Sequence, residues 1–143
     1  MRGKVQRGRQ HGFSLMELLI VMVIIGLLAS LVGPTLFKKV GGAKQKTARA
    51  QIEMLGTALD SYRLDIGRYP TTQQSLDALW NKPEGEENWD GPYLRKDGPL
   101  DPWGHAYVYK SPGDHSEYDL SSLGLDGQQG GEDENQDVNS WEN

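Results

Sequence analysis

Residues 11–37 read HGFSLMELLIVMVIIGLLASLVGPTLF, and this stretch decides the fold because it is apolar almost throughout. From Phe13 onward its one charged residue is Glu17. A helix of about 25 residues at about 1.5 Å each reaches about 37 Å, more than the roughly 30 Å hydrocarbon core of a bilayer. The sequence therefore predicts a membrane-spanning helix over residues 13–37.

This apolar stretch has three possible interpretations: a secretory signal peptide, a plain membrane anchor, and a helix that remains after a leader is removed. A signal peptide has an apolar core of about 7–15 residues and ends in a small-residue cleavage site, and neither feature is found here. A plain anchor explains the length but not Glu17, because a carboxylate at mid-bilayer costs about 2.5–3.5 kcal/mol on insertion scales. A Glu17 that reaches the lipid headgroups is the simpler alternative.

The leader, residues 1–12, carries four basic residues and no acidic one, and it ends in glycine. Residues 12–17, GFSLME, resemble the cleavage site of class III signal peptides, which type IV pilins and type II secretion pseudopilins share. The resemblance implies that a prepilin peptidase cleaves between Gly12 and Phe13 and methylates the new amine of Phe13. It also implies that Glu17 faces the N-terminal amine of a neighbouring subunit during assembly.

Charge excludes one class of partner. The chain has 15 basic and 20 acidic residues, and without the leader 11 basic residues stand against 20 acidic ones, a net charge of −9. This balance argues against a nucleic-acid partner, because phosphate contacts need a basic face. Cysteine is absent, which excludes a disulfide or a thiolate metal site.

Basic residues do not settle the orientation of the apolar segment in a membrane. Four precede it, and five follow it closely, namely Lys38, Lys39, Lys44, Lys46 and Arg49. The rule that cytoplasmic flanks are the more basic therefore gives close to a tie.

Pro34 interrupts the apolar run, and it leaves the carbonyl of Ser30 without a helical N–H partner. One interpretation is a kink of the kind that membrane helices tolerate. The family resemblance implies instead that residues 26–34 lose regular helix in assembled filaments.

An amphipathic helix is predicted over residues 38–67. Its apolar positions recur every three or four residues, which places them on one face; they are Ile52, Leu55, Leu59, Tyr62 and Ile66. Gly41-Gly42 is a weak point, and Gly67 is a suitable C-terminal cap.

Beyond residue 68 the sequence predicts short elements joined by loops. Thr72 is the expected N-cap of a short helix that ends near Trp80. A loop dense in Gly, Pro and polar residues follows over 81–99, with Trp89, Tyr93 and Leu94 as expected anchors. Residues 103–110 and 118–123 read as the two strands of a hairpin.

Several short stretches of this C-terminal half resemble the major pseudopilin of type II secretion. They are DPWG at 101–104, YVY at 107–109, PG at 112–113, YDL at 118–120 and SLGLDG at 122–127. The resemblance implies an α+β fold in which the leader (1–12) precedes a membrane and assembly helix (13–37), a helical spine (38–67) and a small periplasmic domain (68–143). Type IV pilins, the alternative, typically have a larger sheet and often a C-terminal disulfide.

Residues 126–137, DGQQGGEDENQD, form a candidate metal loop. The spacing does not fit an EF-hand, because Gln128 and Gly130 stand where that template needs Asp or Asn. From composition alone, a solvated acidic tail is the simpler interpretation. The resemblance implies a structural calcium ion instead. Its implied ligands are the carboxylates of Asp126 and Asp133, the backbone carbonyls of Leu123 and Asn135, and Asp137, which Glu132 or Glu134 could replace.

No pattern in the sequence favours an enzyme, since the histidines and serines form no recognisable nucleophile motif. The resemblance implies a non-enzymatic filament subunit held in the inner membrane by one span, with its domain in the periplasm. Its implied partners are further copies of itself, minor pseudopilins, the prepilin peptidase, lipid, and an inner-membrane assembly platform with a cytoplasmic ATPase. Such a filament drives export of folded proteins across the outer membrane. A membrane-anchored calcium-binding module that never polymerises is the remaining alternative.

Overall fold

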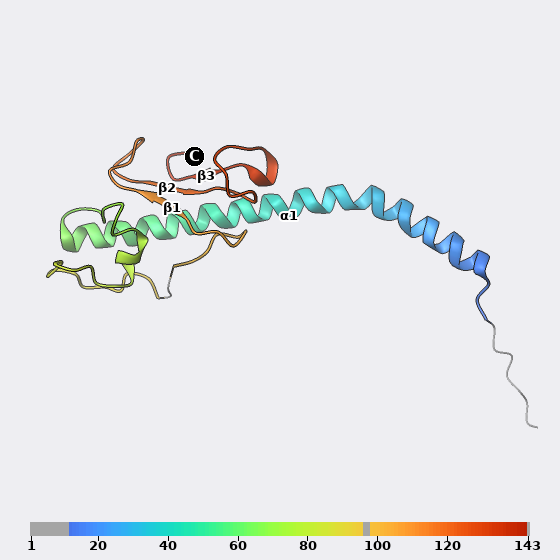
Figure 1. Cartoon of the computed structure of the whole chain (residues 1–143), viewed down its shortest axis with the longest axis horizontal. Coiled ribbons are helices and arrows are strands. Elements are labelled where there is room, and N and C mark those ends of the chain that lie inside the picture. The colour runs from blue at the N-terminus through green and yellow to red at the C-terminus, as the bar shows by residue number, and fades with distance from the viewer. Residues whose placement is uncertain (1–11, 96–97, 143) are drawn as a thin grey trace, which may run out of the picture. The chain divides into compact units, whose positions relative to one another are not determined.

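The computed structural model describes residues 12–95 and 98–142, so the predicted leader lies outside the described residues except for Gly12. The described elements are the helix α1 (Leu15–Ile66), the 3-10 helices η1 (Leu76–Leu79) and η2 (Asp133–Asn135), and the strands β1 (Val108–Lys110), β2 (Asp119–Ser122) and β3 (Val138–Asn139) (Figure 1). The chain divides into two compact units between Phe37 and Lys38. The predicted α+β class, a long helix with a small antiparallel sheet, is confirmed.

Helix α1 is continuous through Pro34 and through Gly41-Gly42. It ends as predicted at Gly67, which has a φ of +88° and donates its N–H to the carbonyl of Arg63 at 2.7 Å. A residue with a side chain adopts this left-handed conformation only with strain, so glycine suits the end of the helix. Loss of helix over residues 26–34 concerns an assembled filament and stays a prediction.

The predicted apolar face of α1 is the core of the second unit. Ile52, Leu55, Leu59 and Tyr62 are buried, and Ile66 is half-buried against them. Full burial of one such aliphatic side chain contributes about 1.5–3 kcal/mol to folding. One face of a single helix therefore provides much of the apolar surface on which the domain folds.

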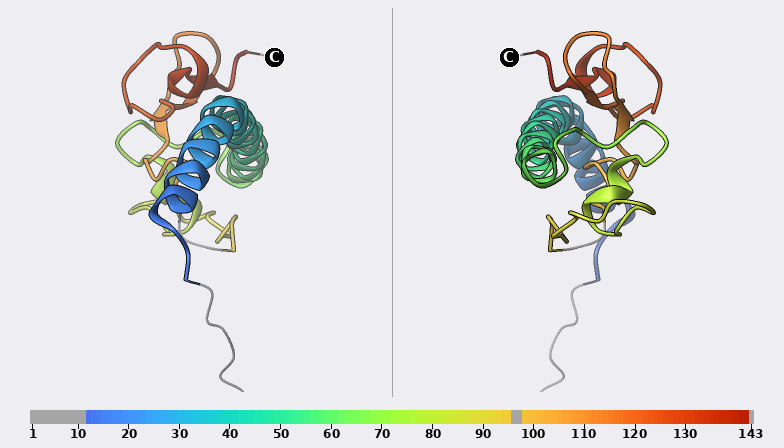
Figure 2. Two further views of the ribbon diagram at one scale, coloured as in Figure 1. Left: turned by 90° about the vertical axis from the view of Figure 1, so that its right-hand side faces the viewer. Right: turned by 90° about the vertical axis from the view of Figure 1, so that its left-hand side faces the viewer.

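The three strands form one antiparallel sheet in the order β1-β2-β3. Tyr109 pairs with Leu120, and Ser122 pairs with Val138. Figures 1 and 2 show the sheet and the C-terminal loop along one side of the second half of α1, and residues 67–95 along another. The central strand β2 is buried along its whole length although three of its four residues are polar.

The predicted hairpin is confirmed, but its strands are shorter than the sequence suggested. Residues 103–107 do not join the sheet, because the backbone of this stretch folds around a buried carboxylate. One oxygen of Asp101 accepts the N–H groups of Trp103 at 3.0 Å and of His105 at 2.8 Å. Those N–H groups are therefore not available to a neighbouring strand. Strand β3 was not predicted.

The predicted short helix exists as η1, but Thr72 does not cap it. Thr71 forms the turn before it: its hydroxyl accepts the N–H of Gln74 at 3.2 Å, and its own N–H donates to the Gln74 side chain at 2.9 Å. The hydroxyl of Thr72 instead bonds Ser111, where it donates to the carbonyl at 3.0 Å and accepts the N–H at 2.9 Å. Thr72 thus joins the end of β1 to the segment after α1.

Aromatic side chains hold the long loop in place, as predicted. The indole N–H of Trp89 donates to the carbonyl of Ala78 at 2.8 Å, and the N–H of Tyr93 donates to the carbonyl of Leu79 at 2.8 Å. The Tyr93 ring meets Tyr62 edge to face at 5.7 Å between centroids. Burial raises the pKa of Tyr93 to about 12, with a hydrogen bond to Asp65 adding to the effect.

The turn between β1 and β2 closes over the last described residues of the chain. The ring of His115 stacks on that of Trp141 at 4.0 Å and 5° between planes, and its Nδ1 lies 2.9 Å from Asp119. Burial raises the pKa of Asp119, but hydrogen bonds from the His115 side chain and from the N–H groups of Asp114 and His115 outweigh it. The pKa of Asp119 is therefore below its ordinary value.

Substitutions at two leucines of α1 test which residues form the hydrophobic core. We expect Leu59→Ala, which empties a fully buried site, to lower the free energy of unfolding by about 2–5 kcal/mol. Leu64→Ala, at a side chain that is 85% exposed, should change it by less than about 0.5 kcal/mol. Denaturant titration followed by tryptophan fluorescence measures both. Equal losses would contradict the assigned core.

Asp119 should make stability depend on acid pH. Because its pKa is lower in the folded chain, its contribution is fully present above its unfolded pKa of about 4 and is lost as pH falls through the folded value. We expect Asp119→Asn to be less stable than the unmodified chain at pH 5, with the difference shrinking toward pH 2. Asp114→Asn, at a more exposed carboxylate in the same turn, is the control and should show a much smaller difference. A difference between Asp119→Asn and the unmodified chain that does not change with pH would contradict the assignment.

Candidate functional site

The start of α1 carries the first group of predicted site residues. Gly12 and Phe13 precede the helix, and the side chain of Phe13 is 81% exposed. Glu17 lies in the first turn, where its carboxylate accepts the N–H of Ser14 at 3.4 Å and its own N–H donates to Ser14 Oγ at 3.1 Å. This reciprocal pair is a capping box, which satisfies two N–H groups that the helix itself leaves unpaired. The Ser-x-x-Glu spacing could have indicated it from the sequence.

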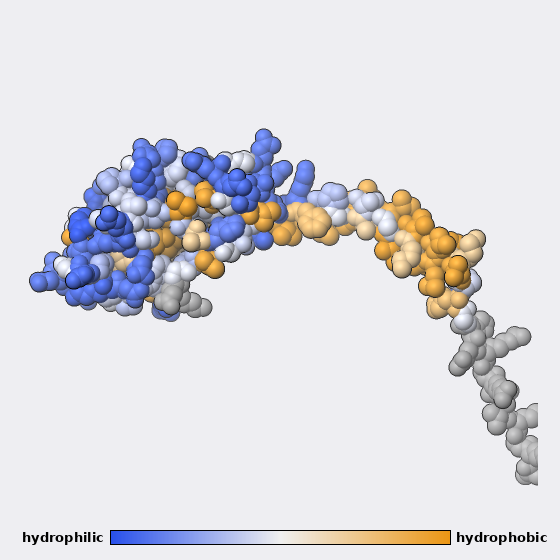
Figure 3. All heavy atoms as spheres, in the orientation of Figure 1, coloured by the Kyte–Doolittle hydropathy of each residue, from blue (hydrophilic) through white to orange (hydrophobic). Residues whose placement is uncertain are grey.

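The part of α1 that precedes Lys38 exposes apolar side chains on all sides. Its most apolar window is not buried at all, and the length and composition of the helix allow it to cross a membrane. Figure 3 shows a hydrophobic surface over most of this part, interrupted by one paler stretch, while the visible surface of the other unit is mostly hydrophilic. An exposed apolar surface of this extent is typical of a lipid-facing or protein-facing segment.

The predicted metal loop has two arms that run next to each other. The N–H of Leu125 donates to the carbonyl of Glu134 at 2.9 Å, which joins the arm after β2 to the arm that contains η2. One oxygen of Asp126 accepts the N–H of Gln128 at 3.0 Å. One oxygen of Asp137 accepts the N–H of Gly130 at 2.8 Å, across the loop. The carboxylates of Asp126 and Asp137 therefore stabilise the backbone of the loop through hydrogen bonds that do not involve an ion.

Two glycines enclose the carbonyl of Asn135. A Cβ at Gly124 would lie 2.8 Å from this oxygen, and a Cβ at Gly131 would lie 2.6 Å from it. Both glycines also have left-handed backbones, with φ of +64° and +100°. Any side chain at either position would fill the space around the carbonyl. The backbone of the two glycines therefore lies close to the Asn135 carbonyl, which is one of the predicted ligands.

Asp137 offers a free oxygen at the same loop. Its Oδ1 is buried and has no hydrogen-bond partner within the described residues. Leu123 and Asp137 also line one cavity of about 290 Å³. A buried carboxylate oxygen without a donor is unfavourable unless a cation or a water meets it, so these residues fit a calcium ion by their chemistry.

The predicted ligands do not converge as a cluster of side chains. Within residues 12–95 and 98–142, no three His, Asp or Glu side chains lie close enough to hold a metal ion. The carbonyl of Asp133 accepts a hydrogen bond from Gln45 of α1, and the residue has a φ of +54°. Any ion here would depend on backbone carbonyls together with one or two carboxylates, a donor set that calcium accepts.

Sequence reasoning missed two residues before β1, His105 and Asp101, that support the loop. His105 Nδ1 lies 3.1 Å from the carbonyl of Gly124, and a Cβ at Gly127 would touch the same ring. The second oxygen of the buried Asp101 accepts the hydroxyl of Ser122 at 2.6 Å. The Asp101 carboxylate thus fixes both the His105 turn and the end of β2. Only the DPWGH stretch itself could have pointed to it.

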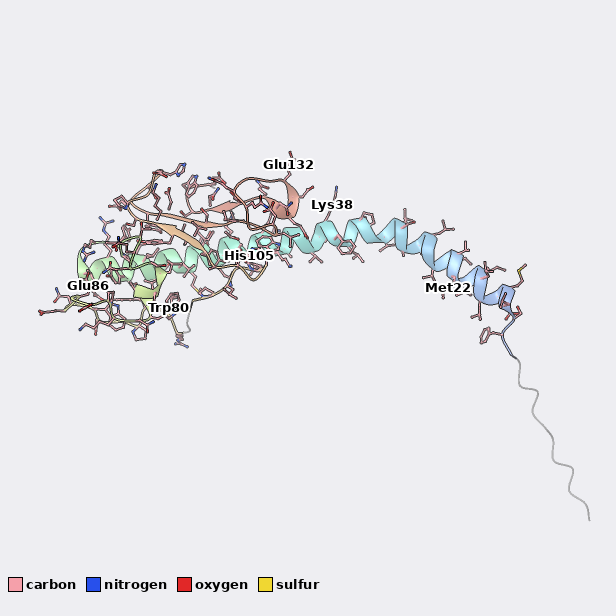
Figure 4. The ribbon with its side chains drawn as sticks, viewed as in Figure 1. Met22, Lys38, Trp80, Glu86, His105 and Glu132 are labelled. Atoms are coloured by element: carbon pink, nitrogen blue, oxygen red, sulfur yellow. The ribbon has the colours of Figure 1, made fainter. Side chains whose placement is uncertain are left out.

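Helix α1 contacts the loop directly. Besides Gln45, Arg49 reaches the C-terminal segment, where its Nη1 donates to the carbonyl of Glu142 at 2.5 Å. Figure 4 shows Glu132, the residue before η2, above the part of α1 that begins at Lys38, and Gln45 of this part contacts the next residue, Asp133. These contacts join positions about 90 residues apart, and no local pattern in the sequence predicts them.

Comparison with known proteins gives two family models that match this chain. Residues 35–141 match type II secretion system (T2SS), protein G, and residues 7–33 match the prokaryotic N-terminal methylation motif. The second match includes Gly12, Phe13 and Glu17.

Related proteins are similar to this chain over nearly its whole length. Type II secretion system core protein G of Pseudomonas aeruginosa is 44% identical over 97% of this chain and 100% of its own length. The protein of the same name from Vibrio cholerae is 46% identical over 93% of this chain and 92% of its own length. A crystal structure of the major pseudopilin from the type 2 secretion system of enterohaemorrhagic Escherichia coli superposes with a TM-score of 0.64. That structure is 39% identical and covers 76% of this chain and 95% of its own. The resemblance predicted from the sequence is confirmed, and the chain belongs to the type II secretion system protein G family.

Proposed function

We propose that this chain is the major structural subunit of a type II secretion pseudopilus and has no enzymatic role. The observation that carries the proposal is the exposed apolar part of α1, which follows Phe13, has Glu17 in its first turn and continues into the spine of a small, mainly hydrophilic unit. A subunit of this form can wait in a membrane and then pack its helix against other copies. Contacts between copies that do not close on themselves produce a helical filament.

Membership of the family supports the following proposed cellular setting. The unassembled subunit spans the inner membrane once, with residues 38–143 in the periplasm, after a prepilin peptidase has removed residues 1–12. A cytoplasmic ATPase acts through an inner-membrane platform and adds subunits to a periplasmic filament together with minor pseudopilins. The growing filament drives folded proteins through the outer membrane.

Glu17 is the proposed assembly residue. A carboxylate and an ammonium that are each alone in lipid are both unfavourable, whereas a pair formed between two subunits removes much of that penalty. The amine of Phe13 on a neighbouring copy supplies the ammonium. Such a pair favours a single axial offset between subunits, because other offsets leave both charges unpaired.

Glu17→Ala should separate processing from assembly. We expect the variant to yield an inserted chain with the intact mass of a methylated Phe13 start, like the unmodified chain, and to form no filaments. Mass spectrometry of the purified chain and electron microscopy of sheared filaments measure the two properties.

Ser14→Ala is the matched control, because it removes the hydroxyl of the capping box but keeps the carboxylate. It should still form filaments. Normal filaments from Glu17→Ala would overturn the proposed role of Glu17. A purified chain that retains residues 1–12 would overturn the proposed processing, and with it the filament subunit.

We also propose that the C-terminal loop binds a structural calcium ion. Asp126, Asp133 and Asp137 would supply carboxylates, and Leu123 and Asn135 would supply carbonyls. Support comes from the partnerless Oδ1 of Asp137 and from the glycines that frame the Asn135 carbonyl. The ion would tie together a loop that has little apolar surface of its own, since no residue of 126–137 is buried and Val138, where β3 begins, is the first buried side chain after it.

Calcium should therefore stabilise the folded chain. At a free concentration 100 times the dissociation constant, we expect about 2.7 kcal/mol of added stability, which excess EDTA removes. Thermal unfolding and protease cleavage within residues 124–137, each with calcium chloride and with EDTA, measure this.

Asp126→Asn should lose most of the calcium response, while Glu84→Gln, the same kind of change at an exposed position far along the chain, should keep it. EDTA should also impair filament formation. If calcium and EDTA leave unfolding and proteolysis unchanged, the calcium proposal is wrong, although the filament proposal would stand.

A further inference from the structure

One face of α1 receives the metal loop and the C-terminal segment at three positions spaced four residues apart. Residues 41, 45 and 49 lie one above another on that face, as positions i and i+4 do in any α-helix. Gln45 donates its side-chain N–H to the carbonyl of Asp133, and Arg49 donates to the carbonyl of Glu142. Both acceptors are backbone carbonyls. These two contacts therefore fix the position of the backbone at Asp133 and Glu142 and do not depend on the side chains of those residues.

Gly41 supports the third contact by its lack of a side chain. It is buried, and a Cβ at this position would lie 2.9 Å from Cδ of Glu134 and closer still to Cγ and Oε1. The Glu134 side chain therefore lies directly against the helix backbone. The neighbouring Gly42 is exposed, and a Cβ there would meet no atom within 4 Å.

Two adjacent glycines weaken the interior of a helix, because glycine loses more backbone freedom than alanine when it becomes helical. In this chain the weak pair lies where residues 133 and 134 contact α1. Contact with the loop holds that part of the helix, and the helix in turn holds the backbone of the loop.

We propose that Gly41 and Gln45 are positioning residues of the metal loop, so that calcium binding and helical order over residues 41–49 support each other. This inference rests on the proposed calcium site. Gln45 fixes the backbone of Asp133, and Gly41 gives Glu134 the room that the docked loop needs. Because linkage is reciprocal, a variant that weakens docking lowers calcium affinity, and removal of calcium loosens the helix.

The two glycines provide a matched pair of variants. Gly41→Ala and Gly42→Ala make the same gain in helix propensity, but only the first displaces Glu134. We expect Gly42→Ala to bind calcium as the unmodified chain does, and Gly41→Ala to bind it at least about fivefold more weakly. Isothermal titration of the full chain in detergent with calcium chloride measures the affinities.

Four further measurements separate positioning from general loss of structure. Without calcium, Gly41→Ala should unfold at the same temperature as the unmodified chain or a higher one. Adding Glu134→Ala to Gly41→Ala should restore the affinity of the Glu134→Ala single variant, because the displaced side chain is gone. Gln45→Ala should weaken binding in the same way, and calcium should slow amide hydrogen exchange over residues 41–49 less in Gln45→Ala than in the unmodified chain.

Two results would count against these ideas in different ways. If the unmodified chain binds no calcium, the calcium site fails and this inference fails with it. If it binds calcium and Gly41→Ala matches Gly42→Ala in affinity, the calcium site stands and the proposed linkage to α1 is wrong.

Discussion

Packing against one face of α1 holds the second unit together, because its sheet is too small to enclose a core of its own. The three strands have three, four and two residues. A sheet of this size is stable only when it buries one face against another element. Leu55 and Leu59 supply that surface, and Leu120 of the central strand is buried in the same cluster. The segments that lack regular structure attach to this cluster through aromatic rings and through hydrogen bonds to backbone carbonyls.

The fold was predictable where a regular period or a turn residue determines it. The three-and-four spacing from Ile52 to Ile66 identified the buried face of the helix, and Gly67 identified its end. The strands were less predictable, because their limits depend on which backbone groups other parts of the chain occupy. Asp101 occupies the N–H groups of Trp103 and His105, and the two-residue β3 exists only through its pairing with β2. Neither the hydrogen bonds to Asp101 nor the pairing of β3 can be predicted from the alternation of apolar and polar residues in a short stretch of sequence.

The candidate sites divide in the same way. The GFSLME stretch is local, and a comparison of sequences recovers it independently. The loop is acidic and glycine-rich in sequence, but its support comes from distant residues: Gln45 and Arg49 on α1 and His105 before β1. A hydrogen bond between a side chain and a carbonyl about 90 residues away leaves no repeating trace in the sequence. Ligand assignments at Asp126, Asp133 and Asp137 stay predictions until an ion is measured.

The capping box at the start of α1 has a consequence for a chain that begins at Phe13. Ser14 is then the second residue, so the carboxylate of Glu17 is held by an amide only one residue from the new terminus. In a lone subunit in lipid, the Ser14 N–H would take the place of the neighbour's amine as hydrogen-bond donor to Glu17. This would lower the free-energy penalty of the unpaired carboxylate before assembly. With the proposed role of Glu17, joining a filament would exchange the hydrogen-bond partner of this carboxylate, from the Ser14 N–H of the same chain to the charged amine of a neighbouring copy. The hydrogen bond between Ser14 and Glu17 would then break only when the charged amine of a neighbouring subunit replaces it.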